Sequence, residues 1–338
     1  MTASRSFVSY LPEAGQGAGA FLKRGVIVKK AHVLTEGAVL LALYLVLMLF
    51  ARYVPIIGTI VLFVLPLPFI IFTIRHGIRL TFLLIFAGSI LSILFGSIFS
   101  IITAVTYGLS GLVMGYFYKR KQTLGVLVGG SLAYTVSLIV TYIGAKFLME
   151  IDFIHDSIAM MEQSMEQSKT MLESFTTDEQ LSAQFAQLEQ GLEMMVQLVP
   201  TIFITLGVVS AVITHLLASP ILRRLRFDLA PLKPFRDWKL PRSIVWYYLI
   251  VSILLMVNQD TDTFLFTAVI NLYFILQFFV LLQGYSFIFY YSFIKGWSKA
   301  VPILILIGSF LIPILLYLIR ILGIIDLGFP LRGKISKN

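Results

Sequence analysis

Long apolar runs separated by short polar segments fill the sequence on both sides of one acidic stretch, residues 150–199. A run of about 20 apolar residues is long enough to cross the hydrocarbon core of a bilayer as a helix. The predicted spans lie at about 33–54, 56–74, two within 80–118, 123–147, 198–219, 243–257, 264–292 and 301–320. The expected fold class is therefore all-α, a polytopic membrane protein of about nine transmembrane helices with an extracytoplasmic helical hairpin.

The hairpin is predicted from the acidic stretch, where apolar residues recur at intervals of three and four. Two such stripes, 154–175 and 181–195, would each turn one face of a helix toward a partner. Between them, Thr177 with Gln180 three residues later is typical of a helix start. The expected helices are antiparallel and span about 151–175 and 178–199. The alternative is an acidic, solvated loop with weak helicity.

Composition supports a membrane protein. The chain has 338 residues, of which 58% are hydrophobic and 13% charged, and its mean hydropathy is +0.92. Soluble domains seldom reach that balance. The formal charge of +9 sits in short loops between apolar runs, where it sets orientation and does not indicate binding to nucleic acid. There are no cysteines, which excludes disulfides, zinc-thiolate sites and cysteine nucleophiles.

The charge distribution also predicts sidedness. The positive-inside rule places the N-terminus and the basic clusters in the cytoplasm and the acidic hairpin outside a bacterial cytoplasmic (inner) membrane. Nine crossings then leave Arg332, Lys334 and Lys337 outside. We expect these three charges to be a weak exception to the rule; the alternative is that the last apolar run is a re-entrant hairpin.

The spans and loops divide the chain into seven expected segments. They are a cytoplasmic basic tail at 1–30, transmembrane helices 1–5 at 31–149, the extracytoplasmic acidic hairpin at 150–197, transmembrane helix 6 at 198–219, a basic cytoplasmic loop at 220–243, transmembrane helices 7–9 at 244–322 and a C-terminal tail at 323–338.

No catalytic motif is present. The sequence has no phosphate loop, HExxH or GxSxG, and its four histidines are far apart, so we expect no enzyme activity, no metal and no cofactor. The outer ends of the spans supply the candidate substrate-binding residues, which would close a pocket open to the outside. These residues are Arg52, Tyr53, Asn258, Gln259 and Asp260.

Two further surfaces are candidates for partner contact. The basic loop combines cations with aromatic residues, and it would bind either anionic lipid or a cytoplasmic partner. Its candidate residues are Arg223, Arg224, Arg226, Trp238, Lys239 and Arg242. Small residues at four-residue spacing let helices approach closely in lipid. For Gly111 with Gly115 we expect internal packing, whereas Ala38 and Ala42 in the first span are candidates for contact with a partner helix.

Several short motifs carry a family resemblance: Glu36-Gly37-Ala38, Pro66-x-Pro68, Gly108-x-x-Gly111, Trp238-Lys239-Leu240-Pro241-Arg242 and Gly323-Ile324-Ile325-Asp326 followed by Leu331-Arg332. The chain resembles the YybS-like family of uncharacterised bacterial polytopic membrane proteins. Its first six spans are similar to the substrate-binding (S) subunit of energy-coupling-factor transporters. That resemblance implies that an Ala-x-x-x-Ala pattern on the first helix packs on a transmembrane coupling subunit, and Ala38 and Ala42 match the pattern.

Two functions follow as hypotheses. In the first, a core like the substrate-binding subunit captures a small molecule from outside and needs a partner to supply energy. In the second, the protein is a non-transport scaffold or sensor. Its hairpin would pair with another copy of itself, giving a homo-oligomer, or with another extracytoplasmic helix, and loop 220–243 would hold a cytoplasmic enzyme.

Overall fold

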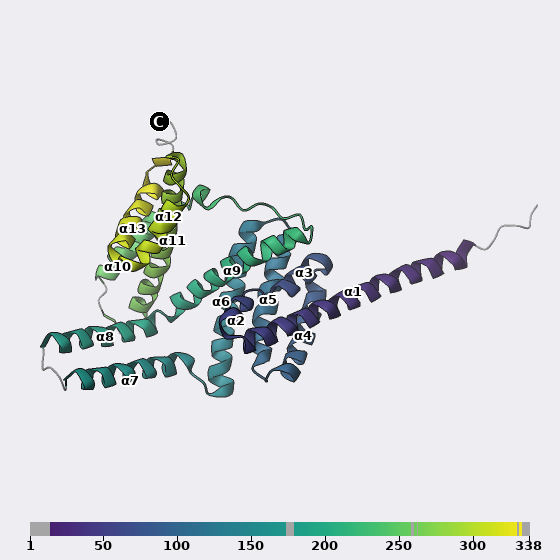
Figure 1. The fold of residues 1–338 in the computed structure, drawn as a ribbon, viewed down its shortest axis with the longest axis horizontal. Coiled ribbons are helices and arrows are strands. Elements are labelled where there is room, and N and C mark those ends of the chain that lie inside the picture. The colour runs from purple at the N-terminus through teal and green to yellow at the C-terminus, as the bar shows by residue number, and fades with distance from the viewer. Residues whose placement is uncertain (1–13, 174–178, 258–259, 262, 330, 333–338) are drawn as a thin grey trace, which may run out of the picture. The chain divides into compact units, whose positions relative to one another are not determined.

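The structure is a computed structural model that describes residues 14–173, 179–257, 260–261, 263–329 and 331–332. Every element in these residues is a helix (Figure 1), which confirms the all-α class. The chain forms two compact units. The N-terminal unit runs to Ala133 and includes Val212–Leu229, and the C-terminal unit comprises Tyr134–Ala211 and Ala230–Asn338. The six-span core expected from the resemblance therefore does not coincide with a single unit.

The N-terminal unit begins with six consecutive helices. They are α1 (Ala14–Tyr53), α2 (Pro55–Leu62), α3 (Leu67–His76), α4 (Ile78–Phe95), α5 (Ser100–Lys119) and the first part of α6 (Thr123–Met149). The last part of α9 (Val199–Arg224) completes the unit. The predicted second span is broken between α2 and α3 by a turn that ends at Pro66. Helix α1 starts at Ala14, so the expected tail 1–30 is helical from that residue onward.

Close approach of α5 to its neighbours holds this unit together. A side chain on Gly108 would collide with Ile85, and one on Gly111 would lie 2.6 Å from the carbonyl oxygen of Pro66. Gly115 is equally tight against Thr73. These glycines let α5 pack directly on the backbones of α3 and α4, which confirms the internal-packing interpretation of Gly111 and Gly115.

The C-terminal unit contains the hairpin and the last helices of the chain. Its elements after α6 are α7 (Phe153–Glu173), α8 (Glu179–Gln197), the first part of α9, the short 3-10 helix η1 (Phe235–Asp237), α10 (Ser243–Val257), α11 (Phe264–Ile294), α12 (Ala300–Leu311) and α13 (Pro313–Gly328). Helices α7 and α8 confirm the two predicted hairpin helices, while the proposed cap at Thr177 lies outside the described residues. The tail expected from residue 323 begins inside α13.

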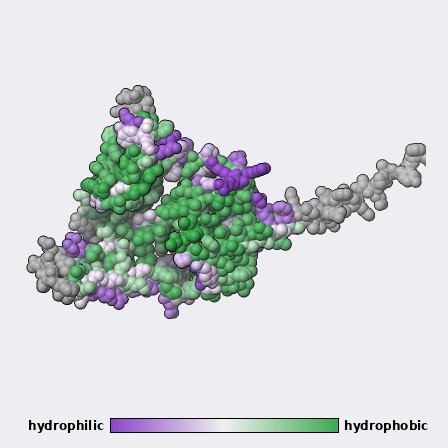
Figure 2. Space-filling view, viewed as in Figure 1, coloured by the Kyte–Doolittle hydropathy of each residue, from purple (hydrophilic) through white to green (hydrophobic). Residues whose placement is uncertain are grey.

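Lengths and surfaces fit a polytopic membrane protein. With α2 and α3 counted together, seven helical segments among the described residues are long and apolar enough to cross a membrane. The seventh and ninth predicted spans correspond to shorter helices, since α10 has 15 residues and α12 has 12. Large apolar side chains are exposed along the apolar helices, for example Phe86 of α4 at 67% and Phe310 of α12 at 73%. Figure 2 shows apolar residues over most of the visible face of α10–α13, as expected for a surface in contact with lipid.

The ninth predicted span is not one continuous helix. Ile312 has an extended backbone (φ −121°, ψ 95°) because the residue before a proline avoids the helical region, and the helix breaks there. At about 1.5 Å per residue, α12 is only about 18 Å long, well short of a crossing of about 30 Å. After the break, α13 brings Arg332 within 2.7 Å of the carbonyl oxygen of Arg236, in the basic loop. The last apolar run is thus a hairpin that returns to its starting end, and Arg332 lies beside the loop rather than opposite it.

Candidate functional site

The three residues of the motif Glu36-Gly37-Ala38 on α1 have different surroundings. Glu36 turns toward α3, where its carboxylate pairs with Arg75 and lies 2.8 Å from Nε2 of His76. A side chain on Gly37 would lie 3.3 Å from the ring of Phe72, so this face of α1 packs tightly. The Glu36 side chain is only 12% exposed, and its carboxylate joins α1 to the end of α3.

The opposite face of α1 is uncovered within the described residues. Ala38 and Ala42 are both exposed, whereas Leu41 and Tyr44 are buried at 9% and 0% exposure. Because residues four apart lie above one another on a helix, the two alanines form a shallow strip that a second helix could approach closely. The structure thus places the predicted contact pair on a free surface, and its partner stays a prediction.

The candidate substrate residues are not brought together in a described pocket. Arg52 and Tyr53 end α1 in the N-terminal unit, and Tyr53 is 72% exposed. Asp260 belongs to the C-terminal unit, where its carbonyl oxygen accepts from the Thr263 hydroxyl at 2.9 Å. Asn258 and Gln259 lie outside the described residues. A shared site for these residues therefore remains a prediction.

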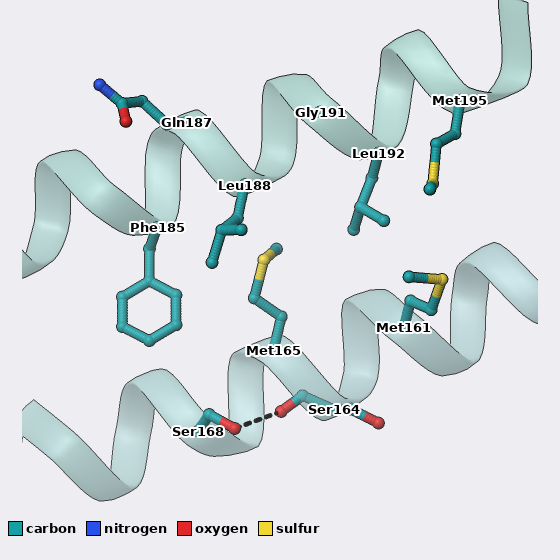
Figure 3. Close-up of a pocket in the computed structure, with 10 residues that line it drawn as sticks. All are labelled: Met161, Ser164, Met165, Ser168, Phe185, Gln187, Leu188, Gly191, Leu192 and Met195. Atoms are coloured by element: carbon teal, nitrogen blue, oxygen red, sulfur yellow. Dashed lines mark hydrogen bonds between the residues drawn. The ribbon is translucent and has the colours of Figure 1, made fainter. Parts of the chain in front are cut away.

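The hairpin encloses an apolar groove that the sequence predicted only as a helix–helix seam. Figure 3 shows Met165 from α7 and Leu188 from α8 pointing into the space between the helices, while Gln187 points away. The groove has a volume of about 470 Å³. Phe185 and Leu192 are buried in it at 7% and 8% exposure, yet Leu188 is 56% exposed. The apolar faces of α7 and α8 are thus only partly in contact, and part of their apolar surface is exposed to solvent.

Carboxylates line a second hollow along the same seam. This hollow shares Met165 and Leu192 with the apolar groove and is lined by Glu162, Glu166, Glu189 and Glu193. The hairpin is therefore a two-helix layer on which apolar and acidic surfaces are segregated. No group of three or more His, Asp or Glu residues in the described part of the chain is placed to hold a metal ion.

Asp152 fixes the start of the hairpin. Its carboxylate lies 2.7 Å from Nζ of Lys146 and accepts from the Tyr142 hydroxyl at 3.0 Å. It also accepts from the backbone N–H of His155 at 3.1 Å, which caps the first turn of α7. The Lys146 hydrogen bond, followed by that from the His155 amide, lowers the pKa of Asp152 to about 2. The carboxylate is therefore ionised at neutral pH and ties α6 to α7.

The basic loop is divided between the two units. Arg223, Arg224 and Arg226 are exposed and belong to the N-terminal unit, and Lys239 and Arg242 are exposed in the C-terminal unit. Trp238 is half-buried, its indole N–H donates to the carbonyl of Lys233 at 2.9 Å and its ring packs edge-on against Phe235, so its role in docking or lipid contact stays a prediction. Lipid contact and partner docking both stay open for the five exposed cations.

A buried polar cluster, which the sequence did not predict, anchors this loop. We call Gln283, Ser286, Asp326 and Arg332 the clasp. Arg332 donates from Nε and Nη2 to the Asp326 carboxylate at 2.7–3.1 Å, and Gln283 also donates to that carboxylate. The single hydroxyl hydrogen of Ser286 is shared between the carbonyl oxygens of Phe235 and Trp238, each 2.8 Å from its Oγ. Asp326 is 1% exposed, so its charge depends on these partners.

The clasp joins the two C-terminal motifs noted in the sequence. The loop motif contributes backbone groups, including the N–H of Leu240, which donates to Gln283 at 3.0 Å. The tail motif contributes Asp326 and Arg332. A lone aspartate in an apolar run, followed six residues later by an arginine, was the available signal, but spacing alone does not show that a loop about 90 residues earlier completes the set.

Comparisons with known proteins agree with the membrane architecture. The sequence matches the family described as "Predicted membrane protein (DUF2232)" over residues 42–327. It is 35% identical over 311 residues to the uncharacterized protein YybS of Bacillus subtilis (strain 168), covering 91% of this chain and 100% of that protein. No solved structure matches the chain.

Proposed function

The chain belongs to the DUF2232 family of predicted membrane proteins. We propose that it is the substrate-capturing membrane subunit of an energy-coupled uptake system. The substrate would be a small molecule taken from outside the cell. The sequence has no phosphate loop, so we propose that a separate coupling subunit with ATPases supplies the energy and that the chain itself catalyses no reaction.

One observation carries this proposal: the strip of Ala38 and Ala42 is exposed on a helix whose other face is packed. In lipid, apolar surface gives helices little reason to associate, so affinity depends on close backbone contact. Alanines on an otherwise bulky exposed face, with Val39 and Val46 each 62% exposed beside them, offer such a contact. The strip supports docking of a second transmembrane protein on α1.

The proposed orientation places the N-terminus and the basic loop in the cytoplasm and the acidic hairpin outside. The clasp supports it, since it brings Arg332 to the same end of the C-terminal unit as Lys239 and Arg242. Every basic cluster considered in the sequence can then obey the positive-inside rule without an exception. Capture would occur at the outer end, beside the hairpin.

The test is co-purification of the tagged full-length protein from membranes in mild detergent. We expect the wild type to recover a coupling subunit with its ATPases and Ala38→Trp to lose it, because an indole fills the strip. Leu43→Trp is the matched control: this residue is 41% exposed but lies roughly 100° around the helix from Ala42, at about 3.6 residues per turn. Failure to recover a coupling subunit with the wild type, or equal loss in both variants, would contradict the proposal.

A second function is favoured by the hairpin. We propose as the alternative that the protein is a scaffold or sensor whose hairpin pairs through its open apolar groove with a second copy, while the basic loop holds a cytoplasmic enzyme. Leu188 and Met195, at 56% and 46% exposure, would be covered by such pairing. The carboxylates lie in the other hollow of the hairpin and would not have to meet across the new interface.

One pair of variants distinguishes the two proposed functions. Leu188→Glu places a charge in the groove, and Gln190→Glu adds the same charge to an exposed position two residues away on α8. If the hairpin is the working surface, Leu188→Glu alone should abolish self-association in cross-linking of intact membranes. If uptake is the function, neither variant should change recovery of the coupling subunit.

A further inference from the structure

Two basic clusters that are about 40 residues apart in the sequence meet at one end of the N-terminal unit. The first turn of α4 contributes Arg79, and the end of α5 contributes Lys119 and Arg120. Together they line a cavity of about 470 Å³ whose other residues are Thr73, His76, Gly77, Ile78 and Tyr116. We call this cavity the basic cavity. It lies at helix ends, where a spanning helix meets the headgroup layer.

The carboxylates around the basic cavity are already engaged. Glu36 pairs with Arg75 and His76, and Asp228 pairs with Lys121. Within the part of the chain that the structure describes, Arg79, Lys119 and Arg120 have no carboxylate partner. The Arg120 guanidinium lies 4.3 Å from the centre of the Tyr116 ring, which orients it without neutralising it.

The backbone adds to this positive charge. Helix α4 begins here with no acidic residue in its first turn and no side-chain cap, so its first N–H groups and the positive end of its dipole are uncompensated. Gly77 makes the turn with φ +86°, and the ammonium of Lys119 lies 4.0 Å from the place that a Cβ on Gly77 would occupy. A cation held beside a helix start is unfavourable unless an anion lies between them.

We propose that the basic cavity binds an anionic phosphate group, held by Arg79, Lys119 and Arg120 at the start of α4. A guanidinium group can donate two parallel hydrogen bonds to two oxygens of a phosphate, and a lysine ammonium adds a compact positive charge. Helix N–H groups supply further donors to the same oxygens. The phosphate belongs either to the headgroup of an anionic lipid or to a soluble phosphate ester. This inference does not depend on the proposed uptake function.

The test uses the purified full-length protein in uncharged detergent, with phosphatidylglycerol as the lipid probe and glycerol 3-phosphate as the soluble probe. Bound phosphatidylglycerol is measured by native mass spectrometry against phosphatidylcholine at equal concentration. We expect the wild type to retain phosphatidylglycerol selectively. Lys119→Gln should weaken that retention roughly fivefold, as expected for loss of one basic residue near anionic lipid, and Lys119→Arg should restore most of it.

Lys121→Gln is the matched control. It makes the same change in net charge two residues from Lys119, but Lys121 pairs with Asp228 and does not line the basic cavity. The Lys121→Gln variant should retain phosphatidylglycerol nearly as well as the wild type does. Competition by millimolar glycerol 3-phosphate would assign the site to soluble esters, and its absence would assign it to lipid. Equal effects of Lys119→Gln and Lys121→Gln, or no preference of the wild type for either anionic probe, would overturn the proposal.

Discussion

Replacing Arg332 by glutamine should destabilise the C-terminal unit more than any exposed charge substitution. In the clasp, the Arg332 guanidinium donates to both oxygens of Asp326, to the carbonyl of Arg236 at 2.7 Å and to Ser286 at 3.2 Å. Arg332 is 12% exposed and Asp326 1%. Removing the cation therefore leaves a buried carboxylate with one remaining side-chain partner, Gln283.

Breaking one side of a buried pair typically costs about 3–5 kcal/mol. For a unit of 150–250 residues, each kcal/mol lowers the unfolding midpoint by roughly 2–4 °C, so Arg332→Gln should lower it by roughly 6–20 °C. The midpoint can be measured in detergent from the fraction of protein that stays monodisperse after heating. The exposed neighbour pair Arg236–Asp237, 3.9 Å apart, supplies the control, and Asp237→Asn should change stability by less than about 0.5 kcal/mol.

A double-mutant cycle completes this test. Replacing Asp326 by leucine together with Arg332 by methionine removes both charges and fills the space with apolar groups, which is often near neutral for a buried pair. The double variant should therefore lose less stability than the sum of the two single losses, and this difference, the coupling free energy, should be at least about 2 kcal/mol. Additive losses, or a midpoint shift below about 2 °C for Arg332→Gln, would refute the buried clasp.

Three further predictions concern packing, pH and topology. Gly284→Ala should destabilise the protein by about 1–3 kcal/mol in the same heating assay because its Cβ would collide with a carbonyl oxygen of α13, whereas Gly308→Ala meets only one methyl group at 3.9 Å and should be tolerated. The folded pKa of Asp152 is lowered to about 2, so its cap on the His155 amide should stabilise the start of α7 fully above about pH 4, the unfolded pKa, and should be lost as the pH falls toward 2. Hydrogen exchange at the His155 amide should speed up over this pH range, and Asp152→Asn should abolish that pH dependence. A cysteine appended to the C-terminus should react with impermeant thiol reagents from the same side as Lys239→Cys, and reaction from opposite sides would restore the nine-span topology.

The sequence predicted those features that depend on local periodicity. The three-and-four spacing of apolar residues located α7 and α8, and Ser243–Val257 coincides with the seventh predicted apolar run. Helices break at Pro66 and before Pro313, and proline is a local signal for such breaks because it lacks the backbone N–H. In each case the signal lies within a few residues of the element that it predicts.

Pairing between distant segments was not predictable in the same way. The ion pair of Glu36 was not predicted, because its partners Arg75 and His76 lie about 40 residues away on another helix. Arg332 was counted as a scattered charge for the same reason. Spacing alone does not show which helix ends meet, and a charge near an apolar run looks alike whether it is paired or solvated.

In the candidate sites, too, local spacing was predictable from the sequence and packing between segments was not. Ala38 and Ala42, which the sequence marked by their four-residue spacing, are exposed beside the buried residues Gly37 and Leu41 of α1. The open groove of the hairpin did not follow from its two stripes, because the stripes predict contact but not how completely the side chains fill the seam.

Sidedness is the claim on which both proposed functions depend, and single cysteines measure it directly because the natural chain has none. Gln187→Cys places a thiol on the exposed surface of α8, and Lys239→Cys places one in the basic loop. With an impermeant maleimide on intact cells, the account predicts labelling at position 187 and none at position 239 until the membrane is permeabilised. Labelling of both from the same side, or of position 239 alone in intact cells, would contradict it.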